Sequence, residues 1–190
     1  QAIDIGDINH KYKDLEIKKF CRRYNFFQDL PFSQGNFYKT INRIFPSSKY
    51  ILTIRDPDKW FKSLCNFHLI YFRKMGLNFK NIAEVKEEHL KKFDWIKEGY
   101  YYDYTKTFWI SEIKDNQQIY NWNLLYNKDH YIHVYEKRNK EIQDYFQKRK
   151  EDLLIFNVSE NSNILKILNF LHMKKDLNFE LPHELKSNYD

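Results

Sequence analysis

The sequence predicts an α/β protein with three layers, in which helices cover a central, mainly parallel sheet. Short apolar runs of strand length lack the strict alternation of a half-buried sheet, which is typical of parallel strands buried on both faces. Segments with helical periodicity lie between these runs, as in layered α/β folds. The 190-residue length suits a single domain that buries its own core.

Three apolar runs are predicted to form the strands of this sheet. They are YNFF at 24–27, YILTI at 50–54 and LLIFNV at 153–158. The second and third are rich in Ile, Leu and β-branched residues, which favour a pleated, buried surface.

Four segments have the periodicity of amphipathic helices, namely 36–45, 57–75, 128–149 and 161–173. The start of the second is the best defined of them. Asp56 suits the N-cap, and Pro57 suits the first helical turn, where the backbone N–H that proline lacks has no helical partner.

The region 76–127 differs from the rest of the chain in being rich in Tyr, Trp, Lys and Asn. Its densest part is DWIKEGYYYDYTKTFW at 94–109. We interpret the region as a helical insertion within the single domain, serving as a lid or a substrate-side segment. The alternative is an ordinary helical layer whose aromatic side chains belong to the core.

The net charge of +6 favours anionic ligands in general, without indicating nucleic acid. The densest basic cluster, KKFCRR at 18–23, is broken by Phe20 and Cys21 and forms no nucleic-acid-binding tract. We therefore expect no nucleic-acid partner. The simpler alternative is that the excess positive charge belongs to lysine side chains that are exposed to solvent and bind no ligand.

Two cysteines in 190 residues do not form a disulfide framework and fit a reducing compartment, so a cytoplasmic location is predicted. No cluster of Cys and His has the spacing of a zinc site, and no metal is expected. The longest apolar segment, LIYF at 69–72, is far shorter than the ~20 residues needed to span a bilayer. No secretory signal is visible.

Arg55 stands directly after the apolar run 50–54, at the carboxyl end of a predicted strand. Ligands of parallel α/β sheets bind beyond these ends, and the N-terminus of the following helix faces the same crevice. Ser63 follows eight residues after Arg55. A guanidinium, a hydroxyl and a helix N-terminus together suit a phosphate. The alternative is that Arg55 pairs with Asp56 or another carboxylate.

The segment FPSSKYILTIRDPDKWFKSL at 45–64 closely resembles the 3′-phosphate-binding segment of sulfotransferases. Three further blocks are similar to that family, and they read QDLPFSQGNFYKTI, YEKRNKEIQDYFQKRKEDLLIFNVSE, and NILKILNFLHM followed by FELPHELKSN. The resemblance is strongest to single-domain bacterial and viral-type members. It implies a P-loop-like fold and a sulfuryl donor, 3′-phosphoadenosine 5′-phosphosulfate (PAPS), whose 3′-phosphate is held by Arg55 and Ser63. The acceptor would be a hydroxyl or amine of a small molecule or carbohydrate.

The chain departs from the family pattern at its beginning. Family members open with a strand and a Gly-rich loop bearing Lys or Arg and Ser or Thr, which holds the 5′-phosphosulfate. Gly6 in DIGDINH is followed by no such turn. We expect the loop either to precede Gln1 or to be missing.

Two residues are candidates for the base that takes the acceptor's proton. Asp29 follows the predicted strand 24–27, where the resemblance places the base. The alternative is a carboxylate that only holds its loop. His68 lies five residues beyond Ser63 on the same helix. The alternative for His68 is a hydrogen-bonded core histidine.

Three more residues are candidates for contacts to the nucleotide. Trp60 could pack near the adenine, although a Trp at helical spacing is also a common core residue. His183 and Lys186, in LPHELKSN, could close over the nucleotide.

Three rival functions remain open on the sequence alone. A P-loop nucleotide kinase would share the strand-end Arg but would need a GxxxxGK[ST] loop and an acidic magnesium ligand. A non-catalytic nucleotide-binding remnant would keep the fold without the 5′ loop. A basic nucleic-acid binder is disfavoured because cations and aromatics do not interleave along one stripe.

Overall fold

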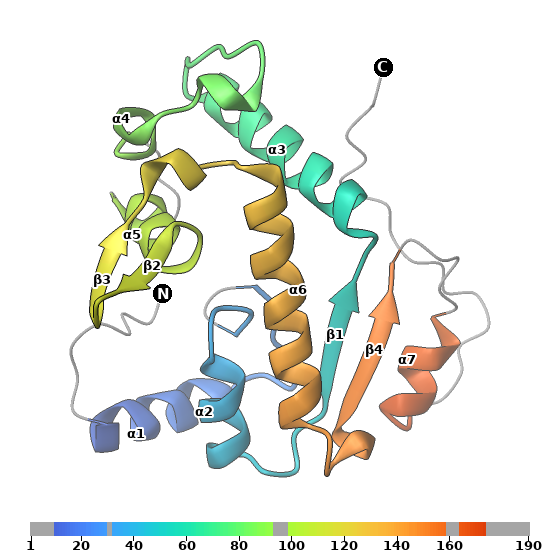
Figure 1. The fold of residues 1–190 in the computed structure, drawn as a ribbon. Coiled ribbons are helices and arrows are strands. Elements are labelled where there is room, and N and C mark those ends of the chain that lie inside the picture. Colours follow the sequence, from blue (N-terminus) through green and yellow to red (C-terminus); the bar gives the residue numbers. More distant parts are fainter. Residues whose placement is uncertain (1–9, 30–31, 93–98, 159–163, 174–190) are drawn as a thin grey trace. The chain divides into compact units, whose positions relative to one another are not determined.

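A computed structural model describes residues 10–29, 32–92, 99–158 and 164–173, drawn as coloured ribbons in Figure 1. The chain forms two compact units, Gln1–Lys49 and Tyr50–Asp190. The prediction of one domain with an insertion at 76–127 stays a prediction.

The first unit is helical, with α1 at His10–Cys21 and α2 at Phe37–Ile44, the latter close to the predicted helix at 36–45. A bidentate ion pair joins the two helices. The Arg43 guanidinium donates to both carboxylate oxygens of Asp14, at 2.5 and 2.8 Å.

The strand predicted at 24–27 is wrong, because residues 24–28 form no strand. Their aromatic rings join a local cluster instead, in which Phe27 stacks on Phe32 with ring centroids 4.4 Å apart. Phe20 contacts Tyr24, Phe27 and Phe32. A run of aromatics resembles a buried strand in sequence, but ring-to-ring contacts can bury it without any ladder of backbone hydrogen bonds.

The second unit contains the parallel sheet. Strands β1 (Tyr50–Ile54) and β4 (Leu153–Asn157) lie side by side and point the same way (Figure 1). Ile54 pairs with Asn157 at the carboxyl end, where the N–H of Val158 also donates to the Ile54 carbonyl at 2.9 Å. The predicted α/β class with a parallel sheet is thus confirmed, with two strands in that sheet among the described residues.

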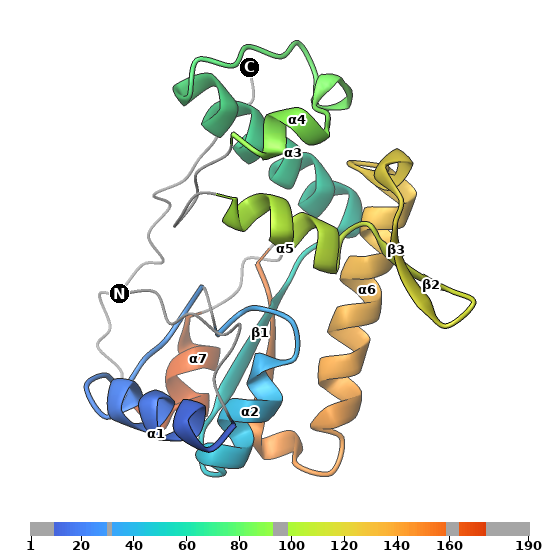
Figure 2. The same cartoon turned by 90° about the vertical axis from the view of Figure 1, so that its left-hand side faces the viewer.

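Two long helices accompany β1. Helix α3 (Pro57–Lys74) follows it directly, and α6 (Lys128–Tyr145) runs beside it in both Figure 1 and Figure 2. Both match predicted helices, although α6 ends a few residues earlier than expected. The 3₁₀ turn η3 (Lys150–Asp152) then leads into β4, and α7 (Leu165–Phe170) lies within the predicted helix 161–173.

The region 76–127 is not entirely helical. It contains η1 (Ile82–Glu84), α4 (Glu87–Leu90), α5 (Tyr100–Phe108), the antiparallel hairpin β2 (Ser111–Lys114) and β3 (Gln117–Tyr120), and η2 (Trp122–Leu124). The hairpin is unexpected. Its turn residues Asp115 and Asn116 have φ of 51° and 61°, the left-handed conformation that such turns require.

The main apolar core of the second unit draws on α3, α6 and the region 76–127. Its buried members are Cys65, Phe72, Val85, Leu90, Tyr101, Tyr126 and Tyr131. Tyr101 and Tyr126 come from the aromatic-rich region. Part of that region is therefore core, as the alternative interpretation holds, and the role of a lid stays a prediction.

Candidate functional site

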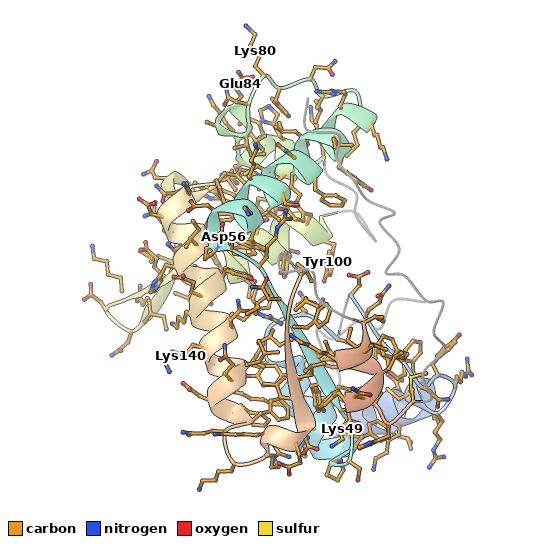
Figure 3. All side chains as sticks on the ribbon, turned by 90° about the vertical axis from the view of Figure 1, so that its right-hand side faces the viewer. Lys49, Asp56, Lys80, Glu84, Tyr100 and Lys140 are labelled. Atoms are coloured by element: carbon orange, nitrogen blue, oxygen red, sulfur yellow. The ribbon has the colours of Figure 1, made fainter. Side chains whose placement is uncertain are left out.

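The site predicted from the sequence lies where β1 passes into α3. Arg55 is the first residue beyond the strand and is partly buried, and α3 begins at Pro57. Figure 3 labels Asp56 at this junction. The predicted arrangement of strand, turn and helix is present.

Asp56 is the N-cap of α3. Its carboxylate accepts a hydrogen bond from the backbone N–H of Lys59 at 2.9 Å, and its carbonyl accepts from the N–H of Trp60 at 2.8 Å. The second of these is the first regular bond of the helix, so the Asp56 side chain caps one of the amides that would otherwise be free, that of Lys59. The expectation that free N–H groups of α3 face a ligand stays a prediction, with one fewer amide available than the sequence suggests.

The guanidinium of Arg55 makes no ion pair with any carboxylate in the described ranges. Its neighbour Asp56 is engaged in the cap, and the next acidic residue, Asp58, pairs with Lys128 at 2.5 Å. The alternative interpretation predicted an ion pair between Arg55 and Asp56, and the described residues do not form it. No carboxylate of these ranges therefore competes with the anionic ligand that the sequence predicts for Arg55.

The backbone of Arg55 is held from α6. The Tyr135 hydroxyl accepts from the Arg55 N–H at 2.9 Å and donates to the Arg55 carbonyl at 3.3 Å. Sequence reasoning missed this role of Tyr135. The available signal was the residue type, because the hydroxyl of a partly buried tyrosine needs a polar partner.

Ser63 and His68 lie on different faces of α3. At 100° per residue, five residues place them about 140° apart around the helix axis. Ser63 is partly exposed, whereas only 3% of the surface of His68 is accessible. The two side chains therefore do not face one ligand together.

His68 is enclosed by tyrosines. Its Nδ1 lies 3.0 Å from the Tyr126 hydroxyl and 3.1 Å from that of Tyr101. Burial lowers the pKa of His68 from 6.5 to about 3, so the ring is neutral at pH 7. These contacts favour the alternative of a hydrogen-bonded core histidine over that of a base.

Trp60 is packed between other aromatics. Its ring stacks on Tyr135, with centroids 4.3 Å apart and planes 14° apart, and contacts Trp109 at 5.7 Å. Trp109 in turn stacks on Tyr131 at 4.6 Å. The adenine contact predicted for Trp60 stays a prediction, and its ring has a packing role in any case.

Asp29 belongs to the first unit, whereas Arg55, Trp60, Ser63 and His68 belong to the second. Asp29 is exposed, and its φ of 57° places it in the left-handed region, which Asp tolerates better than most residues. Its carbonyl accepts from the Ser33 N–H at 2.7 Å. The candidates His183 and Lys186 lie outside the described residues.

Two further searches cover only the part of the chain that the structure describes. No group of three or more His, Cys, Asp or Glu side chains there is arranged to hold a metal ion. None of the helices there has both the length and the apolar character needed to cross a bilayer.

Comparison with known proteins agrees with the resemblance seen in the sequence. A family model described as a sulfotransferase domain matches residues 2–187 of the 190. None of the curated proteins compared with the chain matches it. The match includes the β1–α3 junction with Arg55 and Ser63, as well as the late strand β4. The chain therefore belongs to the sulfotransferase family, whose chemistry is the transfer of a sulfuryl group.

Proposed function

We propose that this protein transfers the sulfuryl group of PAPS to a hydroxyl or amine of a small-molecule or carbohydrate acceptor. The observation that carries the proposal is the β1–α3 junction. It presents an arginine at a strand end, next to an acidic residue that is engaged in capping the helix. A guanidinium without a carboxylate partner is suited to bind a phosphate through two parallel hydrogen bonds.

The residues of the junction fit a 3′-phosphate in chemical type. Arg55 supplies the charge and the planar donor fork, and the Ser63 hydroxyl supplies one further hydrogen bond. Because the Lys59 amide of α3 is already capped by Asp56, we assign most of the binding to these two side chains. PAPS supplies the activated sulfuryl group, and 3′,5′-adenosine bisphosphate is its product.

Asp29 is the preferred candidate for the base, because it is an exposed carboxylate in the segment where the family resemblance places the base. His68 ranks behind it, since burial makes its ring a weak base with a pKa of about 3. Trp60, His183 and Lys186 are proposed to contact the nucleotide. We also propose a cytoplasmic location, supported by the low cysteine content and by the free thiols of Cys21 and Cys65.

The test is a calorimetric titration of the protein with 3′,5′-adenosine bisphosphate, with adenosine 5′-monophosphate and with ATP plus magnesium. The proposal expects the bisphosphate to bind most tightly, because it alone carries a 3′-phosphate. Preferential binding of ATP with magnesium would instead support a phosphoryl-transfer enzyme.

Turnover is tested separately, by incubating the protein with radiolabelled PAPS and a panel of phenols, amines and sugars. Release of the bisphosphate together with a sulfated product would establish the transfer. Tight binding of the bisphosphate without turnover of any acceptor would favour the non-catalytic alternative.

A further inference from the structure

The geometry points to Tyr135 as a positioning residue that holds the backbone of Arg55 in place, so that the guanidinium can meet a 3′-phosphate. This inference rests on the proposed function for its ligand. Its structural part concerns only the contacts among β1, α3 and α6.

The ladder of the parallel sheet ends just before Arg55. Ile54 pairs with Asn157, and the Val158 N–H closes the last bond of the ladder onto the Ile54 carbonyl. Alternate residues of a parallel strand direct their N–H and carbonyl to opposite sides, so Arg55, next to the bonded Ile54, directs its own away from β4. Backbone polar groups at a partly buried position need partners, since leaving them unpaired is costly.

One hydroxyl supplies both partners. Tyr135 Oη accepts from the Arg55 N–H at 2.9 Å, and its proton is donated toward the Arg55 carbonyl oxygen at 3.3 Å. The contact joins residues that are 80 positions apart in sequence. It fixes the peptide units on both sides of the Arg55 Cα, from which the guanidinium extends.

The Tyr135 ring is itself held by the helix that follows Arg55. Trp60 of α3 stacks on it nearly in parallel, with ring planes 14° apart. Tyr135 therefore contacts both arms of the same junction, the strand end through its hydroxyl and the helix through its ring. This double contact ties the end of β1 and the first turn of α3 to one side chain of α6.

A second link between the helices contributes less. Lys128 at the start of α6 pairs with Asp58 at the start of α3, but both side chains are more than half exposed. Exposed ion pairs of this kind contribute little because water and salt screen them. The Tyr135 contact is part-buried and bonded to the backbone, so it is the better candidate for fixing the junction.

Loss of the Tyr135 hydroxyl should affect the binding of some ligand groups and not of others. Without the Tyr135 hydroxyl, the N–H and carbonyl of Arg55 must form hydrogen bonds with water instead. The position of the guanidinium is then less well defined. In such a variant, binding of a 3′-phosphate must also order the Arg55 backbone, which the wild-type protein holds in place before the ligand arrives. Ligand groups that Arg55 does not touch should bind as before.

The experiment uses Tyr135→Phe, which removes the hydroxyl and keeps the ring that stacks on Trp60. Affinities for 3′,5′-adenosine bisphosphate and for adenosine 5′-monophosphate are measured by calorimetry. We expect the bisphosphate to bind about five-fold more weakly, the size of one hydrogen bond, with no change for the monophosphate. The matched control is Tyr145→Phe, on the same helix, where the ring contacts Phe146 and Arg149. Equal weakening of both ligands by Tyr135→Phe, or no weakening of either, overturns the inference.

A second readout needs no ligand and separates this inference from the proposed function. Amide hydrogen exchange of Arg55 is followed by NMR in the wild type and in Tyr135→Phe. We expect a protected amide in the wild type and exchange at least ten-fold faster in the variant, with amides within β4 unchanged. An Arg55 amide that is already unprotected in the wild type, or equally protected in the variant, overturns the positioning role. If the wild type binds both nucleotides equally, the proposed function fails while this result still decides the role of Tyr135.

Discussion

The carboxylate of Asp56 accepts a hydrogen bond from the backbone N–H of Lys59, 2.9 Å away, at the first turn of α3. This contact commits the acidic residue beside Arg55 to the helix rather than to the neighbouring guanidinium. Two adjacent charges of opposite sign therefore serve different purposes. Asp56 caps the helix, whereas the role proposed for Arg55 is to bind an anionic ligand.

The cap makes a prediction about stability. Asp56→Ala should lower the free energy of unfolding by about 1 kcal/mol, because the Lys59 amide loses its acceptor. Asp56→Asn keeps a capping oxygen and should lose much less. Urea denaturation of both variants checks this. An equal loss in the two variants would show that charge, and not the cap, is what matters at this position.

Removing the guanidinium should weaken nucleotide binding and leave the fold intact. Arg55→Ala is expected to cost about 1.5–3 kcal/mol in affinity for 3′,5′-adenosine bisphosphate, the range of a charged hydrogen-bonded contact. The control is Arg73→Ala, an exposed arginine in the last turn of α3. Calorimetry gives both affinities, and an unchanged affinity for Arg55→Ala would show that the site lies elsewhere.

If Arg55 and Ser63 hold the same phosphate, their contributions should be coupled. In a double-mutant cycle of Arg55→Ala and Ser63→Ala, we expect an interaction energy above about 0.5 kcal/mol for the bisphosphate. The same cycle measured with adenosine 5′-monophosphate should give none. Strict additivity with the bisphosphate would indicate that the two side chains act on different ligand groups.

The buried His68 predicts a dependence of stability on pH. Its pKa falls from 6.5 to about 3 on folding, so below about pH 6.5 the unfolded chain binds a proton that the folded chain does not. The contribution of neutral, buried His68 to the free energy of unfolding is therefore complete above that pH. It is lost as the pH falls toward 3, at up to about 1.4 kcal/mol per pH unit. Tyr101 and Tyr126, which contact the ring, and Cys65, one turn earlier on α3, remain neutral because burial raises the pKa of each.

The check is the difference between the wild type and His68→Asn, which can still bond a tyrosine hydroxyl but cannot titrate. Unfolding free energies at pH 7 and pH 5 should differ less in the variant. Parallel pH profiles would mean that His68 is protonated in the folded protein, against its burial.

The strand, turn and helix at 50–74 were predictable because three signals agree there: an apolar run, an N-cap with proline, and helical spacing. The run at 24–27 misled because aromatic residues satisfy the pattern of a buried strand while packing on one another. The β2–β3 hairpin was missed because its turn has no glycine, and Ile113 is 82% exposed instead of facing a core.

The candidate site was predictable only in part, for a similar reason. Arg55 and Ser63 follow from local sequence, since both lie on the strand–helix segment itself. The hydroxyl that holds Arg55 comes from Tyr135 on another helix, and no local pattern records such a contact. His68 lies on the predicted helix, but its burial depends on tyrosines from the region 99–126.

The pairing of β1 with β4 also bears on how the protein folds. Leu52 pairs with Ile155, so the two strands meet only when a loop of about 100 residues closes. Closing such a loop costs conformational entropy, which slows folding. Helices α3 and α6 rest on local contacts and can form earlier. During synthesis, the strand end that carries Arg55 can gain its partner strand only after residue 157 has left the ribosome. The proposed nucleotide site at this end of the sheet should therefore be among the last features that the nascent protein forms.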